Sequence, residues 1–208
     1  MKAMILAAGL GTRLRPLTND RPKALVTVAG RTLLELTLSR LRAFGVNEVI
    51  LNVHHFRDMI LAYLEANQNF GMRIEISSEE VLIDTGGGLK KAAWFFLEDG
   101  GPKDEPFFVH NVDVLSTIDL ARMVSFHNEH GALATLAVQQ RDTSRPLLFN
   151  QHGQLCGRRT GRNGGAKDEK RQPHGSDKDP QRPHTFFDNT RGTSGLCRAV
   201  IRRARPGV

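Results

Sequence analysis

Cysteine and tryptophan are both scarce in this 208-residue chain, which contains two cysteines and one tryptophan. Two cysteines, Cys156 and Cys197, are too few for the disulfide framework of a small secreted protein. No apolar run approaches the roughly 20 residues that a membrane-spanning helix needs. The first residues also lack the pattern of a signal peptide, which has a charged start, an apolar middle and a cleavage site with small residues. These absences predict a cytoplasmic protein without a membrane partner, long enough for one buried core.

The excess of positive charge is confined to the last quarter of the chain. The formal net charge is +7, yet residues 157–208 hold 13 Lys and Arg against 5 Asp and Glu, which leaves 16 against 17 in residues 1–156. Residues 158–208 contain few aliphatic side chains and show no strand or helix period. We therefore expect a folded domain at 1–157 and a basic, low-complexity, disordered tail at 158–208. Only Leu196, Val200 and Ile201 indicate a short helix there.

The first 140 residues alternate between short β-type runs and stretches with helical spacing. This pattern is typical of an α/β domain with a mostly parallel sheet. We expect strands at 2–7, 48–53, 73–77, 106–110 and 133–139, helices at 32–44, 57–67, 87–97 and 119–129, and an edge hairpin from residue 147 to 157. Ser116 or Thr117 is the expected cap of the last helix, and Gly131 follows its end. The carboxyl edge of such a sheet is where ligands bind.

A loop with two glycines and an arginine follows the first expected strand. It reads Gly9-Leu10-Gly11-Thr12-Arg13, and it lacks the Gly-Lys-Ser/Thr ending of a Walker A loop. The third glycine of a dinucleotide-binding fingerprint is also missing, because Leu14 stands there. Glycines let backbone N–H groups approach phosphate oxygens, and Arg13 can bind them in a bidentate manner, with Lys23 as a second cation. The loop therefore predicts a phosphate-binding site.

The longer stretch LAAGLGTRLRPLTNDRPKAL resembles the signature of the sugar-1-phosphate nucleotidyltransferases. That signature has a Gly-x-Gly-Thr-Arg loop, a Pro-Leu-Thr and a later Pro-Lys, all of which are present. The resemblance covers residues 1 to about 157. It implies a Rossmann-like three-layer sandwich, the nucleotide-diphospho-sugar transferase fold, with a C-terminal part that is truncated or disordered. The segments VAGRTLLE, LNVHHFRD and DTGGGLKKA are most similar to the mannose-1-phosphate guanylyltransferase-like and N-acetylmuramate-1-phosphate uridylyltransferase-like branch, which in bacteria implies a role in cell-envelope precursor synthesis.

Two downstream segments complete the expected site. A strand that ends in Asn111-Val112-Asp113 places two polar side chains on one side of the sheet edge, and hard oxygen ligands of this kind suit Mg²⁺. The resemblance implies that Asp113 binds this metal and that the Thr-Gly-Gly stretch beginning at Thr85 contacts the nucleobase. The alternatives are that Asp113 caps the next helix and that the glycines only serve packing. The implied nucleotide-binding residues are Ala7, Ala8, Gly9, Gly11, Thr12, Arg13, Thr85, Gly86, Gly87 and Asn111.

The resemblance also implies a reaction and its substrates. A sugar-1-phosphate oxygen attacks the α-phosphorus of a nucleoside triphosphate, and the products are a nucleotide-diphosphate sugar and pyrophosphate. Arg13 would hold the β- and γ-phosphates, Lys23 would stabilise the α-phosphate, and Asp113 would place Mg²⁺ between the α- and β-oxygens, which makes these three the catalytic residues. GTP with mannose-1-phosphate, or UTP with an amino-sugar-1-phosphate, are the substrate pairs that fit the branch. The choice between them and the oligomeric state stay open.

Residues 158–208 admit three further interpretations. Family members carry sugar-phosphate contacts and a second metal-binding aspartate in this region, and because neither is present, the chain could be a nucleotide-binding remnant with impaired catalysis. A shift of one nucleotide allows Pro-Phe-Ser-Thr-Ile-His for Thr185 to Thr190, similar to a strand of such enzymes, so the tail could be a frameshift product. Nucleic-acid binding by the basic tail is less favoured, because only Phe186 and Phe187 could stack on bases.

Overall fold

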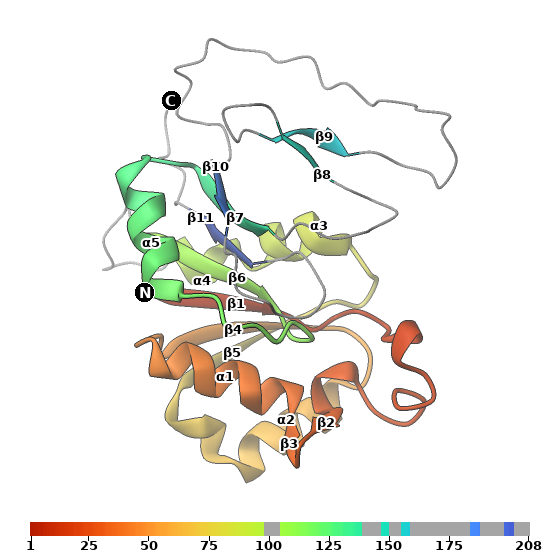
Figure 1. Cartoon of the computed structure of the whole chain (residues 1–208). Helices are drawn as coiled ribbons and strands as arrows, with labels where there is room; N and C mark the ends of the chain where they lie inside the picture. Colours follow the sequence, from red (N-terminus) through yellow and green to blue (C-terminus); the bar gives the residue numbers. More distant parts are fainter. Residues whose placement is uncertain (98–104, 139–146, 150–154, 159–183, 188–197, 202–208) are drawn as a thin grey trace, which may run out of the picture.

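The computed structural model describes residues 1–97, 105–138, 147–149, 155–158, 184–187 and 198–201. Seven strands form one sheet in the order β10-β7-β11-β6-β1-β4-β5 (Figure 1). Their bounds are β1 Lys2–Leu6, β4 Glu48–Val53, β5 Arg73–Ser78, β6 Phe107–Asn111, β7 Ala134–Val138, β10 His184–Phe187 and β11 Arg198–Ile201. All neighbouring strands run parallel except β11, which is antiparallel to both β6 and β7. The expected mostly parallel sheet is confirmed.

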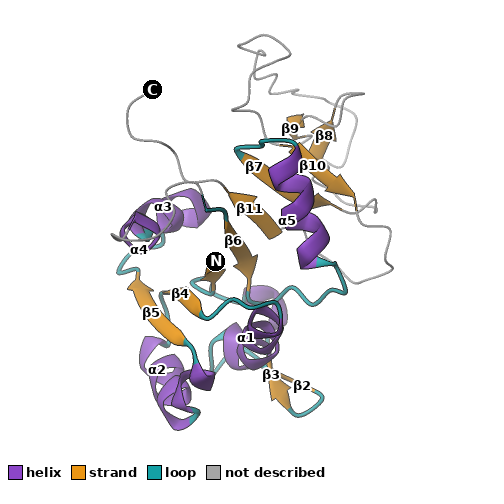
Figure 2. Ribbon diagram, turned by 90° about the vertical axis from the view of Figure 1, so that its left-hand side faces the viewer, coloured by secondary structure: helices purple, strands orange, loops and turns teal. Residues whose placement is uncertain are grey.

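Helices cover both faces of this sheet (Figure 2). Side chains of α1 (Leu33–Ala43), α2 (Arg57–Ala66) and α5 (Leu120–Glu129) pack on one face, and those of α3 (Asp84–Lys91) and α4 (Ala93–Leu97) pack on the other. The three-layer α/β/α arrangement that the alternating pattern predicts is therefore present. No helix among the described residues is long and apolar enough to cross a bilayer.

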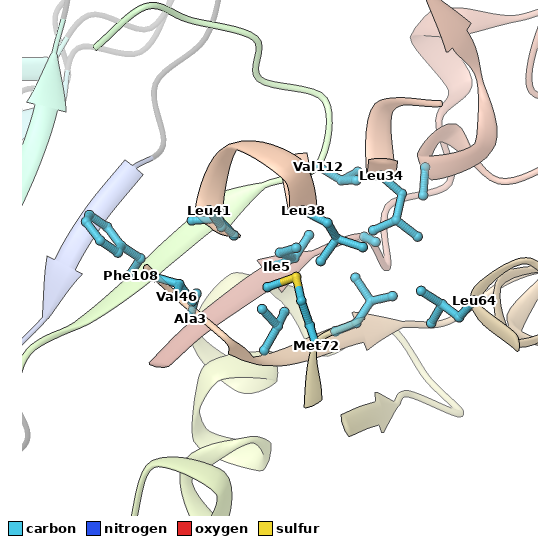
Figure 3. Packing of buried hydrophobic residues seen from close by; sticks show 14 of the residues in the cluster. Ala3, Ile5, Leu34, Leu38, Leu41, Val46, Leu64, Met72, Phe108 and Val112 are labelled. Atoms are coloured by element: carbon cyan, nitrogen blue, oxygen red, sulfur yellow. The ribbon is translucent and has the colours of Figure 1, made fainter. Parts of the chain in front are cut away.

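Alternate residues of β1 supply the two cores. Ala3 and Ile5 point to the α1 side, where Leu34, Leu38 and Leu41 of the helix pack over them (Figure 3). Met4 and Leu6 point to the other side, where they join Phe95 and Phe96 of α4 in a second cluster. A parallel strand covered on both faces must be apolar along its whole length, which explains the continuous run at the start of the chain. The same burial fixes the end of β1, and with it the start of the glycine loop.

The ends of the helices follow local capping chemistry. The Thr32 side chain accepts a hydrogen bond from the Glu35 backbone N–H at 3.0 Å and starts α1. Asp119 caps α5 by accepting from the Arg122 backbone N–H at 3.0 Å. The sequence prediction of Ser116 or Thr117 as this cap is wrong, because the helix starts three residues after Thr117. The helix expected at 87–97 starts earlier, at Asp84, and is interrupted at Ala92.

Smaller elements and the tail complete the description. Strands β2 (Thr27–Val28) and β3 (Arg31–Thr32) pair with each other, as do β8 (Leu147–Phe149) and β9 (Leu155–Arg158). The β8–β9 hairpin was expected at a sheet edge, but it is a two-stranded sheet of its own. The turn of that hairpin lies outside the described residues. Within 158–208, the structure describes the end of β9 and strands β10 and β11. The short helix expected around Val200 and Ile201 is instead strand β11. The proposed boundary at residue 157 stays a prediction.

Candidate functional site

A pocket of about 370 Å³ opens at the carboxyl edge of β1, β4 and β6. This is the edge at which the parallel sheet was expected to bind a ligand. Five of the predicted residues line it, together with others that the sequence did not single out. The lining residues are Leu6, Ala8, Gly9, Lys23, Asn52, Glu79, Leu82, Asp84, Thr85 and Asn111.

The glycine loop forms one wall of this pocket. Ala7 and Ala8 are buried directly after β1, and the Ala7 backbone N–H donates to the Asn52 carbonyl at 2.9 Å, which fixes the start of the loop. Gly9 is exposed, and a Cβ atom there would lie 3.3 Å from Lys23 Nζ. Gly11 adopts a left-handed φ of +66°, and its carbonyl accepts from the Thr18 hydroxyl at 2.8 Å. The loop therefore presents backbone to the pocket and is closed by its own hydrogen bonds.

We predict that Gly11→Ala lowers the free energy of unfolding by more than Gly30→Ala does. Both glycines have left-handed φ values, +66° and +79°, so each alanine has a conformational cost of about 1–2 kcal/mol. Only at Gly11 would the new Cβ also meet a neighbour, because Thr18 Cγ2 lies 3.0 Å away, while nothing lies within 4 Å at Gly30. Urea unfolding of both variants measures the difference. Equal losses would show that the loop has room to relax.

Thr12 and Arg13 lie in an exposed 3₁₀ turn, Thr12–Leu14, beyond the lining of the pocket. Among the described residues no ion pair of Arg13 is formed, so its guanidinium remains available to a phosphate. Arg21 differs, because it hydrogen-bonds both oxygens of Asp20 at 3.0 and 3.1 Å. That bond lowers the pKa of the Asp20 carboxyl. Arg13 is thus a loop cation whose charge no neighbour in the described part of the chain neutralises.

The structure brings Lys23 and Asp113 together, although 90 residues separate them. Lys23 begins a 3₁₀ turn, Lys23–Leu25, that follows the buried Pro22. Asp113 lies two residues beyond the end of β6. Lys23 Nζ donates to Asp113 Oδ2 at 3.2 Å, and the two side chains are 13% and 37% exposed. Asp113 does not cap the following helix, since Asp119 does, so the alternative role considered for it is wrong.

The Thr-Gly-Gly stretch forms the first turn of α3 on the opposite wall. The Thr85 backbone N–H donates to Asp84 Oδ1 at 2.7 Å, and Thr85 lines the pocket. A Cβ atom at Gly87 would lie only 2.7 Å from Cβ of Ile83, so Gly87 is required for a close approach within the turn. Gly86 is exposed with no neighbour within 4 Å of a Cβ. Packing therefore accounts for Gly87 but leaves Gly86 without a structural reason.

Glu79 and Asn52 are site residues that the sequence analysis missed. Glu79 is only 4% exposed, yet it lines the pocket. Its Oε1 accepts from Asn52 Nδ2 at 2.7 Å, and its Oε2 accepts from the Ile83 backbone N–H at 3.2 Å. Gly88 covers this pair, because a Cβ there would lie 2.8 Å from Glu79 Oε1. The available signal was a polar residue near the end of an apolar strand, since Asn52 is in β4; Glu79 directly follows β5, whose sequence RIEISS is mixed.

The histidines lie beside this pocket. His54 Nδ1 is 2.7 Å from the Glu79 carbonyl, and His54 and His55 line a neighbouring crevice of about 500 Å³. In the described part of the chain, no three His, Cys, Asp or Glu side chains are grouped to hold a metal ion. A single carboxylate such as Asp113 nevertheless fits Mg²⁺, which commonly takes one or two carboxylates and completes its coordination with water and substrate phosphates.

Comparisons with known proteins agree on one family. The sequence model of the family described as nucleotidyl transferase matches residues 2–148. An N-acetylmuramate alpha-1-phosphate uridylyltransferase of Caulobacter vibrioides is 52% identical over 114 residues, covering 53% of this chain and 45% of the relative. A mannose-1-phosphate guanylyltransferase catalytic subunit beta of Dictyostelium discoideum is 40% identical over 139 residues, covering 66% of this chain and 37% of the relative. The chain thus spans less than half the length of these relatives.

A solved structure shares the fold. It is HddC from Yersinia pseudotuberculosis complexed with GMP-PN, with a TM-score of 0.68 at 21% identity, covering 99% of this chain and 94% of that one.

Proposed function

Since this chain belongs to the nucleotidyl transferase family, we propose that it transfers a nucleoside monophosphate from an NTP to a sugar-1-phosphate and releases pyrophosphate. The observation that carries the proposal is the meeting of Lys23 and Asp113 beside Gly9, at a pocket that Thr85 also lines. A phosphate-binding loop, a cation and a carboxylate are the parts needed to align two polyanions and offset their repulsion. The curated relatives carry uridylyl- and guanylyltransferase names, which supports the reaction class.

We propose a role for each of these residues from its position. Backbone N–H groups around Gly9 and the exposed Arg13 would hold the terminal phosphates, and Lys23 would contact the phosphate that is attacked. The sugar-1-phosphate oxygen is already anionic, so no side chain has to remove a proton. Asp113, with Asn111 nearby on the same edge, would hold Mg²⁺, which supplies charge neutralisation to the leaving pyrophosphate when it is bound.

Glu79 supports a preference among nucleobases. Glu79 lines the pocket, and its carboxylate can only accept hydrogen bonds when ionised. Guanine and uracil present a ring N–H on their pairing edge, while adenine and cytosine present a ring acceptor at the corresponding position. A buried carboxylate opposite a ring acceptor would leave that acceptor without a donor and bring lone pairs against lone pairs, and that mismatch is costly. We therefore propose GTP or UTP as the nucleotide, which also fits the printed names of the two relatives.

Replacing Glu79 by glutamine should reduce the preference for GTP and UTP over ATP and CTP. We expect a change of about tenfold or more in the affinity ratio, because one acceptor of the pocket becomes a donor. Glu80→Gln is the matched control, since Glu80 is the next residue, is exposed and lines the crevice rather than the pocket. Isothermal titration with the four NTPs measures the ratio. An unchanged ratio in Glu79→Gln would remove Glu79 from base selection.

The experiment that tests the function is a pyrophosphate-release assay with Mg²⁺. GTP and UTP are each combined with mannose-1-phosphate, glucose-1-phosphate and N-acetylmuramate-1-phosphate. Release that requires both substrates supports the proposed transfer. The second candidate is a nucleotide-binding remnant, which would bind NTP at the pocket beside the glycine loop without catalysing transfer. NTP binding without pyrophosphate release in any combination would support the remnant. Absence of both NTP binding and pyrophosphate release would overturn the nucleotide site.

A further inference from the structure

The ammonium group of Lys23 is held between the glycine loop and a carboxylate. Nζ lies 3.2 Å from Asp113 Oδ2, and the lysine side chain is only 13% exposed. On its other side, the position that a Cβ of Gly9 would take is 3.3 Å from the same nitrogen. In the part of the chain that the structure describes, Asp113 is the carboxylate that neutralises this cation. Lys23 is therefore paired within the protein before any phosphate arrives.

The carboxylate that pairs with Lys23 is the one proposed to hold the metal. A Mg²⁺ ion would lie 2.0–2.1 Å from a ligating oxygen. An ammonium that is hydrogen-bonded to the same carboxylate repels this dication and competes with it for the oxygen lone pairs. Lys23 donates to Oδ2, and its charge repels a dication on either oxygen of Asp113. Each cation therefore weakens the binding of the other to this carboxylate.

We infer that Lys23 takes the place of the divalent cation on Asp113 in the nucleotide-free protein, and that metal binding releases its charge to the triphosphate. This inference rests on the proposed function for the identity of the Asp113 ligand. Free metal then binds weakly, because Lys23 opposes it. Metal-free NTP also binds weakly, because Lys23 is engaged by Asp113. The metal and the NTP bind more tightly together, since each removes the competitor of the other, and by linkage the coupling is reciprocal.

The test is Mn²⁺ binding to the whole nucleotide-free chain, followed by electron paramagnetic resonance. Lys23→Met keeps much of the side-chain length and removes the charge. We expect it to bind Mn²⁺ about tenfold more tightly than the wild type, the size of effect that removing a neighbouring charge has on a carboxylate. Arg31→Met is the control, because it removes one positive charge elsewhere, from the pair that Arg31 makes with Glu35. Its Mn²⁺ affinity should equal that of the wild type.

Asp113→Asn, made in the wild type and in Lys23→Met, shows whether the Asp113 carboxylate is the ligand of Mn²⁺. We expect it to abolish the Mn²⁺ binding gained in Lys23→Met. Thermal melting shows whether Lys23→Met is folded. If it is not, Lys23→Ala takes its place. Equal or weaker Mn²⁺ binding without the lysine, or binding unaffected by Asp113→Asn, would overturn the inference. No nucleotide is present, so its failure is distinct from the failure of the proposed transfer, which the pyrophosphate assay detects.

Discussion

Asp113→Ala is expected to lower kcat for pyrophosphate release by about two orders of magnitude or more, with the fold intact. Asp113 is proposed to hold the cation that neutralises the leaving group, and 37% of its side chain is exposed, so its removal leaves no buried cavity. Lys23→Ala should lower kcat by a comparable factor, because the ammonium group of Lys23 is the charge proposed to contact the attacked phosphate. The loss is expected in kcat, and any loss of stability from the charge left without its partner is measured separately.

The measurement is kcat at saturating NTP and sugar-1-phosphate, with thermal melting to verify folding. Asp58→Ala is the matched control, since it removes a carboxylate that is 95% exposed at the start of α2. It should leave kcat unchanged within about twofold. Turnover close to that of the wild type in Asp113→Ala or Lys23→Ala would contradict these roles.

Gly88→Ala and Gly86→Ala should change stability in opposite directions, although both lie in α3. At Gly88 the new Cβ would lie 2.8 Å from Glu79 Oε1 and 3.2 Å from Asn52 Nδ2, both buried, so we expect a loss of about 1–3 kcal/mol from overpacking. At Gly86 nothing lies within 4 Å, and the better helix propensity of alanine should add about 0.5–1 kcal/mol.

Chemical denaturation of the two variants measures this difference in sign. Gly88→Ala should also weaken NTP binding, because the displaced Glu79 carboxylate lines the pocket. A Gly88→Ala protein as stable as the wild type would mean that Glu79 can move without cost. In that case its position could not discriminate between bases.

The sequence predicted the parts of the site that depend on short segments. The end of β1 and the loop after it are set by an apolar run followed by glycines, so the order of residues along the chain is enough to place Gly9 and Gly11. Local sequence singles out Lys23 and Asp113, and the resemblance implies their roles. Their meeting, however, depends on how the turn after Pro22 lies against the end of β6. That packing is a property of the tertiary structure, and no local pattern encodes it.

Glu79 shows why the sequence analysis missed the other residues of the site. It stands in the run SSEEVLID, where exposed and buried acids look alike in sequence. Its burial depends on Asn52 from β4 and on Gly88 from α3, which come from opposite sides of it along the chain. The cap of α5 was misplaced for a simpler reason, because Ser116, Thr117 and Asp119 can all cap, and only the path of the chain after β6 decides which one does.

The antiparallel strand β11 joins two groups of strands that are otherwise separate. It lies between β6 and β7, so β7 and its neighbour β10 are connected to β6 only through it in the described sheet. A ribosome completes β6 at Asn111 and must add residues 112–197 before it starts β11. During that interval one side of β6 is an open edge with unpaired backbone N–H and C=O groups, which can pair with another chain. The yield of folded protein should therefore depend on synthesis rate and on chaperone supply.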